Sequence, residues 1–323
     1  MDLAGRGMLV TGGEGFLGKH LVRAITARGE FVSVPARATY DLRDAAQARA
    51  MLDESQPQVV WHLAARCGGI GANERAPATF FHDNIVMGAN VLEAARVTGV
   101  EKVVLVGTTC SYPAAAPVPL DEESLWDGYP EETNAAYGIA KRALLTMAQA
   151  YARQHWMCVP CPILANLYGP GDHFETESSH VIPAMIRKFV EAVDDELPVV
   201  TLWGTGKPTR EFLHVADAAR ALLLVAEKVL DEQPVNIPGG PEISIGDLAD
   251  LIAGLVGYGG AIEWDHSRPD GQRRRALSGG RAWRVLGYEP SVPLNEGLRD
   301  TIAWYRAQRN VVPVAVPEVV EAA

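Results

Sequence analysis

A tyrosine and a lysine four residues apart, Tyr137 and Lys141, are the pair in this chain best spaced for acid/base chemistry. Side chains at this spacing project from one face of a helix and can act as a unit. Because an ammonium group stabilises a neighbouring phenolate, the pair predicts a tyrosine with a lowered pKa that passes a proton near neutral pH. The same spacing is common on solvated helix faces, so the pair alone does not identify an enzyme.

A polar run that begins at Thr108 and includes Cys110 follows a predicted strand over residues 102–107. Ligands of parallel sheets bind at the carboxyl ends of the strands. We therefore expect the Thr108 hydroxyl to hydrogen-bond the substrate oxygen that Tyr137 protonates, with Cys110 facing the same cleft. The alternative is a polar strand end without a catalytic role.

A glycine-rich loop joins a predicted strand over 7–11 to an amphipathic helix that runs through about Arg28. Its glycines allow a tight turn, a close approach of backbone to a pyrophosphate, and close packing of helix on strand. A dinucleotide is thus expected at the start of the helix, although a structural glycine turn is the alternative. The residues expected to bind it here are Gly12, Gly15, Phe16, Leu17 and Gly18.

The second predicted strand, over 31–35, decides between the two nicotinamide dinucleotides. An acidic residue at its end would bind the ribose 2′-hydroxyl of NAD, but Pro35-Ala-Arg37 carries no carboxylate. Arg37 is the candidate partner of a 2′-phosphate, which favours NADP (as NADPH); a solvated loop arginine is the alternative. Asp41 and Leu42 could hold the adenine through a carboxylate oxygen and a backbone amide, or this segment could simply cap a helix.

The composition predicts a soluble cytoplasmic enzyme. The chain has 323 residues, 48% of them hydrophobic, and a net charge of -11 without a basic cluster. This balance argues against nucleic acid and anionic membranes as partners, and no apolar run or signal sequence indicates a membrane protein. The cysteines at 67, 110, 158 and 161 form no metal motif, and Cys158 and Cys161 are expected to be structural thiols; no metal site is expected.

Alternating apolar strands and amphipathic helices predict an α/β fold, namely a Rossmann-type doubly wound parallel sheet with a smaller C-terminal substrate-binding domain. The cofactor domain, with the Thr/Tyr/Lys residues, is expected over 1–170, and a mainly substrate-binding, partly interleaved domain over 171–310. The tail, 311–323, has no readable role. Strands are expected over 59–64 and 102–107, with a last strand near 157–166; helices are expected over 80–97, 135–154, 182–193, 214–230 and 244–256.

Taken together, the glycine loop, Thr108 and the Tyr-x-x-x-Lys pair resemble the extended short-chain dehydrogenase/reductase superfamily over nearly the whole chain. Within it, four segments are similar to the GDP-L-fucose synthase family. The GDP-mannose 3,5-epimerases share some of them, but Ser-His-Val-Ile-Pro is more typical of the synthases. The four segments are residues 64–73, Thr109-Cys110-Ser-Tyr-Pro, Ser179-His180-Val-Ile-Pro and 204–214.

The resemblance implies an NADPH-dependent epimerase-reductase that converts a GDP-4-keto-6-deoxy-hexose to a GDP-6-deoxy-hexose. Cys110 and His180 match the residues that exchange protons on the carbons beside the ketone, and Lys141 also contacts the cofactor. The likeness further implies a homodimer formed by helices beside the Tyr/Lys helix. The residues that it places on the GDP-sugar are Lys188, Trp203, Arg210 and Arg275.

Three departures from the family leave the reaction open. Thr108 replaces the usual serine, Gly13-Glu14 replaces the His-Arg of the glycine loop, and the motif after Arg268 ends in Ser278 where aspartate is usual. A carboxylate at 14 would repel a 2′-phosphate, so the NADP prediction depends mainly on Arg37. The alternatives are a GDP-hexose isomerase without net redox change and a non-catalytic sugar-nucleotide sensor. The exact sugar and its final stereochemistry are not specified.

Overall fold

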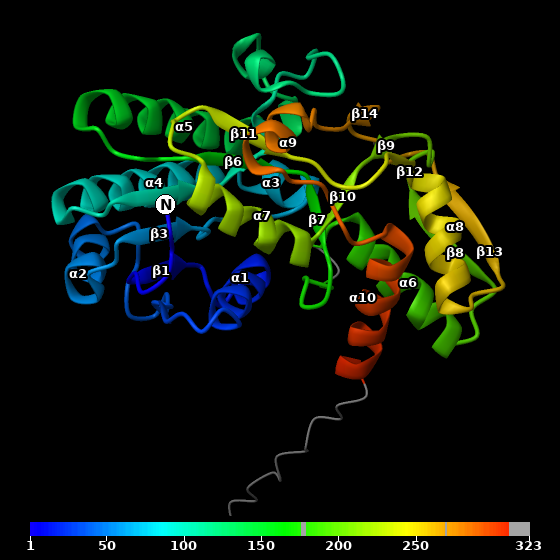
Figure 1. Cartoon of the computed structure of the whole chain (residues 1–323). Helices are drawn as coiled ribbons and strands as arrows, with labels where there is room; N and C mark the ends of the chain where they lie inside the picture. Colours follow the sequence, from blue (N-terminus) through cyan, green and yellow to red (C-terminus); the bar gives the residue numbers. More distant parts are fainter. Residues whose placement is uncertain (176–178, 269, 310–323) are drawn as a thin grey trace, which may run out of the picture.

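The computed structural model describes residues 1–175, 179–268 and 270–309, so the tail predicted over 311–323 lies outside the described residues. Its centre is a parallel sheet with helices on both faces (Figure 1). Four strands are hydrogen-bonded in the order β2-β1-β3-β4. They are β1 (Met8–Thr11), β2 (Val32–Ser33), β3 (Val59–His62) and β4 (Lys102–Leu105).

A second group of parallel strands, ordered β11-β6-β5, extends this sheet. Val103 N and Leu105 N of β4 donate to Cys158 O and Pro160 O, which lie just before β6, so the two groups form one continuous surface. The added strands are β5 (Gly107–Thr108), β6 (Cys161–Leu164) and β11 (Pro234–Ile237).

The strand predicted near 157–166 is present as β6, but the prediction that it is the last strand of the sheet is wrong. Pro234–Ile237 pairs with Cys161–Leu164 along its outer edge. The run at 234–237 has only four residues and comes soon after the predicted helix over 214–230. Apolar runs this short are ambiguous between strand and helix. All four β11 residues are buried. They form a strand because a strand at this position covers the otherwise open edge of β6.

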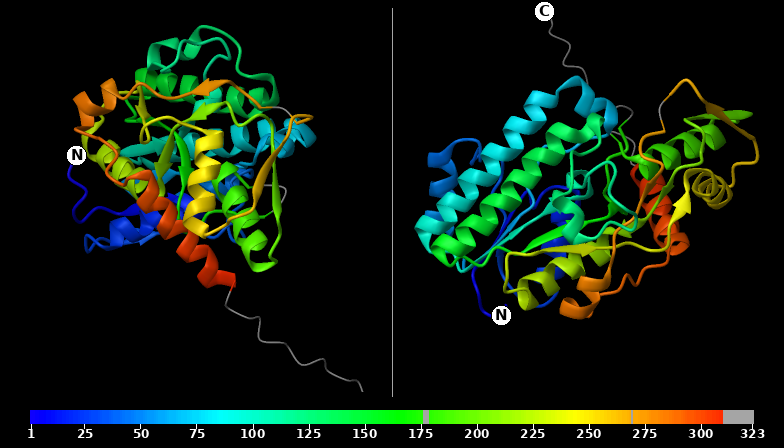
Figure 2. Two further views of the ribbon diagram at one scale, coloured as in Figure 1. Left: turned by 90° about the vertical axis from the view of Figure 1, so that its right-hand side faces the viewer. Right: turned by 90° about the horizontal axis from the view of Figure 1, so that it is seen from above.

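Helices cover the two faces of the sheet in separate layers, as Figure 2 shows. One layer packs α2 against α4 and α4 against α5, and the other packs α1 against α7 and α7 against α9. The helices predicted over 80–97, 135–154 and 214–230 are confirmed. The bounds are α1 (Phe16–Thr26), α2 (Ala45–Ser55), α4 (Pro77–Thr98), α5 (Ala135–His155), α7 (Val215–Lys228) and α9 (Gly280–Leu286).

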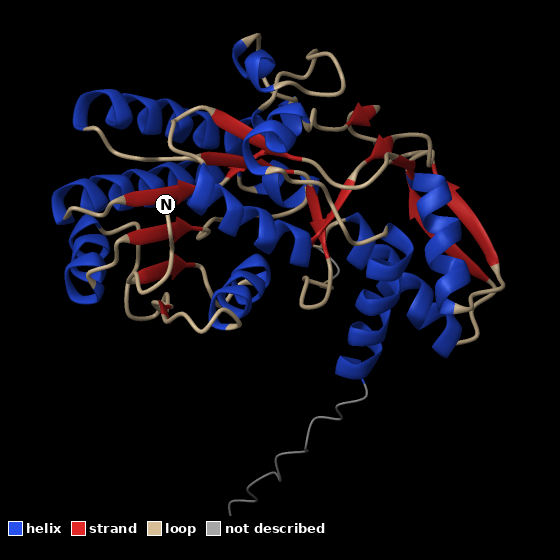
Figure 3. Cartoon of the chain, viewed as in Figure 1, coloured by secondary structure: helices blue, strands red, loops and turns tan. Residues whose placement is uncertain are grey.

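The remaining elements build a smaller lobe with its own apolar core, which is visible beside the main sheet in Figure 3. Helices α6, α8 and α10 pack together, with the parallel pair β8 and β13 against α6. The helices predicted over 182–193 and 244–256 are confirmed. The bounds are α6 (Val181–Asp194), α8 (Ile245–Val256), α10 (Leu294–Arg309), β8 (Val199–Trp203) and β13 (Ala261–Asp265).

Short strands connect the lobe to the main sheet. One group has the order β12-β9-β14, and β10 pairs in parallel with β7. None of the described helices is long and apolar enough to cross a membrane. The short elements are α3 (Ile70–Arg75), β7 (Asn166–Tyr168), β9 (Thr209–Arg210), β10 (Phe212–His214), β12 (Ile243–Ser244), β14 (Arg274–Arg275), and the 3₁₀ turns η1 (Thr109–Ser111), η2 (Glu122–Trp126) and η3 (Glu132–Asn134).

Candidate active site

The first two turns of α5 lie against the polar run at the end of β5, which brings Tyr137 and Lys141 to Thr108 and Cys110. Gly138 permits this approach. A Cβ at that position would lie 2.1 Å from Cys110 O, far inside contact distance. The Ser111 hydroxyl also donates to Gly138 O at 3.1 Å, which fixes helix and turn together. Four of the five predicted catalytic residues therefore surround one point at the carboxyl edge of the sheet.

The expected lowering of the Tyr137 pKa by Lys141 is wrong for this structure. Burial raises the pKa of Tyr137 well above its usual value, Cys67 and Cys110 add to the rise, and the Thr108 hydroxyl opposes it. The Lys141 ammonium instead donates to Val106 O at 3.0 Å, and burial lowers its own pKa. The phenol is therefore a proton donor held in its neutral form.

Cys110 has a cationic neighbour that comes from the far end of the chain. Arg275 Nη1 lies 3.7 Å from Cys110 Sγ, and its Nε donates to Gln272 Oε1 at 2.7 Å. A guanidinium in this position stabilises negative charge on sulfur when the thiol gives up a proton. Two predicted site residues, one catalytic and one substrate-binding, are thus in direct contact.

Arg210 lies beside Arg275, because β9 and β14 pair in parallel with these two residues opposite each other. Burial and the repulsion of Arg275 lower the pKa of Arg210 to about 10, with Asp270 opposing the shift. Two half-buried arginines that repel each other favour a bound anion beside them. The pair therefore suits the diphosphate of a nucleotide sugar.

His180 immediately precedes α6, and the structure gives no contact between it and Tyr137 among the described residues. Its neighbour Ser179 reaches the loop after β3, where Ser179 O lies 3.5 Å from the position of a Cβ on Gly69. Burial by the surrounding protein lowers the pKa of the His180 imidazole below its usual value, and His173 adds a smaller repulsion, although part of the side chain faces solvent. The ring is consequently neutral and able to accept a proton near pH 7.

Two predicted substrate residues lie farther out in the smaller lobe. Lys188 Nζ donates to Thr201 O at 2.7 Å, and burial with the neighbouring Arg187 lowers its pKa. Trp203, at the end of β8, is 64% exposed, and the Arg268 guanidinium lies 4.9 Å from its ring centroid. Within the described part of the chain, neither residue contacts Tyr137, so their roles stay predictions.

The glycine loop forms a cradle between β1 and α1. Gly12 has φ 69°, and a Cβ there would lie 2.8 Å from Ala64 N, while one on Gly18 would lie 2.2 Å from Gly12 O. No side chain caps the first turn of α1, which starts at Phe16 and Leu17 directly after Gly15. Free N–H groups at a helix start, with no side chain in front of them, suit a pyrophosphate, so these residues fit the expected dinucleotide.

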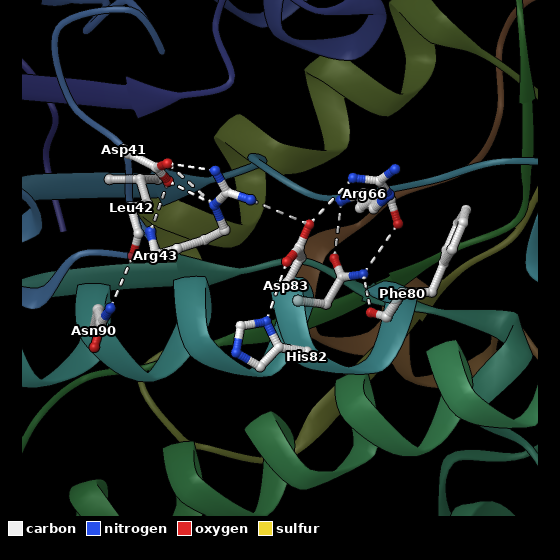
Figure 4. Close-up of polar contacts among 9 residues, drawn as sticks. Asp41, Leu42, Arg43, Arg66, Phe80, His82, Asp83 and Asn90 are labelled. Carbon is white, nitrogen blue, oxygen red and sulfur yellow. Dashed lines mark hydrogen bonds and ion pairs between the residues drawn. The ribbon is translucent and has the colours of Figure 1, made fainter. Parts of the chain in front are cut away.

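A pocket continues from this cradle, lined by Gly12, Arg37, Asp41 and Leu42 among others. Figure 4 shows that Arg43 lies between Asp41 and Asp83. Arg43 holds the pKa of Asp41 at about 2. The Asp41 carboxylate is therefore already paired, and its contact with adenine stays a prediction.

Helix α4 fixes both loops that border this pocket (Figure 4). Asn90 Nδ2 donates to Leu42 O at 2.9 Å, and Arg66 Nη1 pairs with Asp83 Oδ2 at 3.2 Å. Burial alone would raise the pKa of Asp83, but His82, Arg43 and Arg66 together hold it below its usual value. The sequence offered little signal for this network, because its members come from three separate segments.

Two further polar residues near the site were not singled out from the sequence. Cys67 Sγ lies 3.5 Å from Tyr137 Oη. Asp172, after the glycines of 169–171, is only 5% exposed, and its Oδ2 has no hydrogen-bond partner among the described residues. A cysteine in the loop after a central strand and an aspartate after Gly-Pro-Gly are the only signals that pointed to them.

Asp172 leads to a prediction about pH. Burial raises the pKa of Asp172 from 3.8 to about 7, so the native state keeps a proton that the unfolded state loses near pH 4. Stability should therefore fall as pH rises through this window. Replacing Asp172 by asparagine should increase the free energy of unfolding by about 4 kcal/mol at pH 8 and change it little at pH 4. Urea denaturation at both pH values measures the difference.

The matched control is Asp127→Asn, because Asp127 is exposed. It should change stability by less than about 0.5 kcal/mol at either pH. If the Asp172→Asn variant lost stability equally at pH 4 and pH 8, the carboxyl group of Asp172 would not have the raised pKa.

The other thiols have the expected structural role. Cys161 is fully buried in β6, and Cys158 is half-buried, with its sulfur 3.8 Å from Val229 O. All four cysteines are free thiols. No group of three or more His, Cys, Asp or Glu side chains suited to a metal is present in residues 1–175, 179–268 and 270–309.

Comparison with known proteins gives consistent matches. The family model described as "NAD dependent epimerase/dehydratase family" matches residues 8–238. The GDP-L-fucose synthase of Sinorhizobium fredii is 38% identical over 296 residues, which is 92% of this chain and 94% of that protein. GDP-L-fucose synthase 1 of Arabidopsis thaliana is 38% identical over 299 residues, 92% of each. A GDP-L-fucose synthetase structure from Naegleria fowleri bound to NADP has TM-score 0.86 and 29% identity, covering 94% of this chain and 95% of that one.

Proposed function

This chain belongs to the NAD dependent epimerase/dehydratase family, and from that membership we propose that it is an NADPH-dependent epimerase-reductase of a GDP-linked 4-keto-6-deoxy-hexose. The observation that carries the proposal is the convergence at one strand end of an acid, a thiol and two cations. Tyr137 meets Thr108 and Cys110 there, and Arg275 joins Cys110 to Arg210. A reductase alone would need the phenol but not the thiol.

Reduction of the ketone needs a proton for the oxygen that becomes negative. Bound NADPH would supply a hydride to the ketone carbon. Tyr137 would donate its proton to the oxygen, and because its phenol is neutral, that proton is available at working pH. The Thr108 hydroxyl would hold the same oxygen by a hydrogen bond, and Lys141 would stabilise the charge that remains on the phenolate.

Epimerisation beside the ketone needs a base on one face of the ring and an acid on the other. Hydrogens on these carbons are acidic because the ketone delocalises the resulting charge. We assign the two positions to Cys110 and His180, following the resemblance to the synthases; Cys110 is in the turn after β5 and His180 is the residue before α6. Arg275 would stabilise the Cys110 thiolate, and the neutral His180 ring would exchange protons on the other face.

The preference for NADPH is the part of the proposal that rests on Arg37. Arg43 and Arg66 are paired with carboxylates, whereas Arg37 forms no ion pair within the described chain and lines the cofactor pocket. The Arg37→Ala variant should therefore bind NADPH about tenfold more weakly, because a guanidinium–phosphate contact is lost, and should bind NADH unchanged. Titration calorimetry with both dinucleotides measures this. Equal weakening for NADH and NADPH would place the 2′-phosphate elsewhere.

The proposed function is tested by incubating the protein with GDP- and UDP-linked 4-keto-6-deoxy sugars, with and without NADPH. We expect substrate-dependent NADPH oxidation and a GDP-6-deoxy-hexose product whose inverted centres are read by NMR. Conversion of the sugar without NADPH oxidation would instead identify the isomerase. Binding without conversion would identify a sensor.

The homodimer is likewise a proposal. It rests on the resemblance to enzymes that dimerise through helices beside the Tyr/Lys helix, which here are α4 and α5. Analytical ultracentrifugation gives the mass in solution directly. A single species at the 34.8 kDa of one chain would contradict it.

A further inference from the structure

Cys67 connects the catalytic phenol to solvent. The residue lies in the loop between β3 and α3, and its sulfur is 3.5 Å from Tyr137 Oη. Cys67 is exposed, whereas Tyr137 is half-buried on α5. The phenol therefore has a neighbour that carries an ionisable proton and also faces water.

Each catalytic cycle leaves a proton deficit on this phenol. When Tyr137 donates its proton to a ketone oxygen, the phenolate has to be protonated again before the next turnover. The groups that act on its hydroxyl are Thr108, Cys110 and Cys67, and Lys141 lies one helical turn along α5. Lys141 is only 4% exposed and is directed at Val106 O, and Cys110 is in contact with Arg275.

We propose that Cys67 is the acid that returns a proton to Tyr137 after each turnover. In this step the S–H bond of Cys67 breaks as the O–H bond of Tyr137 forms, and the resulting thiolate takes a proton from a solvent water, releasing hydroxide to the buffer. No electrons are gained or lost. The proposal rests on the proposed function, because only a reductase repeatedly consumes the phenol proton.

The direction of transfer follows from ordinary acidities. A thiol is a stronger acid than a phenol by about 1.5 pKa units in ordinary surroundings. Burial raises the pKa of Tyr137 further, so its phenolate is a strong base toward the neighbouring sulfur. Exposure then lets the thiolate recover its proton from water without any movement of the chain.

The test uses Cys67→Ala and Cys67→Ser with NADPH and the GDP-4-keto-6-deoxy sugar. The first turnover uses the proton already on Tyr137, so stopped-flow absorbance should show a burst of about one NADPH per active site at the wild-type rate. Steady-state kcat should then be about tenfold lower, since the later turnovers wait for a proton. Added imidazole should restore kcat in Cys67→Ala by acting as the missing acid.

The Cys67→Ser variant tests whether Cys67 acts as an acid or only as a hydrogen-bonding neighbour of Tyr137. A hydroxyl keeps a hydrogen bond to Tyr137 but is a much weaker acid than a thiol, so Cys67→Ser should behave like Cys67→Ala. The matched control is Cys158→Ala, which removes a half-buried thiol near the opposite edge of the sheet, beside the start of β4. It should show wild-type kcat and no burst.

The outcomes are distinct. A Cys67→Ala variant with wild-type kcat, a slow first turnover, or full rescue by serine would each overturn the relay while leaving the proposed function intact. Absence of NADPH oxidation by the wild-type protein would overturn the proposed function and the relay with it. A burst in Cys67→Ala together with imidazole rescue would establish the relay.

Discussion

Replacing Tyr137 by phenylalanine should lower kcat for ketone reduction by about 10³-fold, the largest effect that we expect from one substitution. The reason is the geometry around its hydroxyl. Thr108, Cys110 and Cys67 all face this oxygen, and burial keeps it protonated. No other described tyrosine stands among these groups. NADPH oxidation at saturating substrate measures the loss, and calorimetry should show unchanged binding of NADPH.

Tyr151→Phe is the matched control, because Tyr151 is on the same helix but its hydroxyl donates to the exposed Glu93. Its kcat should stay within about twofold of wild type. Should Tyr137→Phe retain more than a tenth of the activity, another acid would have to protonate the ketone, and the assignment of Tyr137 would fail.

Replacing Gly138 by alanine should abolish measurable turnover and lower the free energy of unfolding by about 3 kcal/mol. A methyl group there would lie 2.1 Å from Cys110 O and 2.9 Å from Cys110 C, which are backbone atoms and cannot rotate away. The helix would have to move back from η1, which would separate Tyr137 from Thr108. Urea denaturation and NADPH oxidation together measure both effects.

The control for this substitution is Gly254→Ala on α8, where an added Cβ would meet nothing within 4 Å. Alanine has a higher helix propensity than glycine, so Gly254→Ala should gain up to about 1 kcal/mol with normal kcat. If Gly138→Ala behaved like this control, the close approach of α5 to η1 would not be needed for activity.

Local pattern was sufficient to predict the elements that position the site. Strands with continuous apolar runs and helices with 3.6-residue periodicity were identified because the buried face of each element leaves a pattern of apolar residues within a short stretch of sequence. The glycine loop and the Tyr137-Lys141 pair were identified for the same reason, since all their members lie within a few residues of each other. Cys110 was expected in the cleft from its position after the strand at 102–107. Family resemblance added its proton-exchange role and added Arg275, and the structure places the two residues in contact.

Contacts between distant segments could not be predicted in this way. Cys67 meets Tyr137 across 70 positions, and Arg43 meets Asp83 across two loops. The pKa of Tyr137 was misjudged because the spacing that aligns Lys141 with it says nothing about the carbonyl of Val106, to which the lysine is bound. Burial, which dominates the shift, is a property of the assembled fold and not of a motif.

The position of β11 has a consequence for how the chain becomes folded during synthesis. This strand closes the edge of β6, yet the segments of the smaller lobe at 181–203 are made before it. A nascent chain that has emerged only as far as β6 would expose the unpaired, apolar edge of this strand to water. Assembly of the nucleotide-binding half therefore waits on residues translated some 70 positions later, a high contact order that slows folding and makes chaperone engagement advantageous.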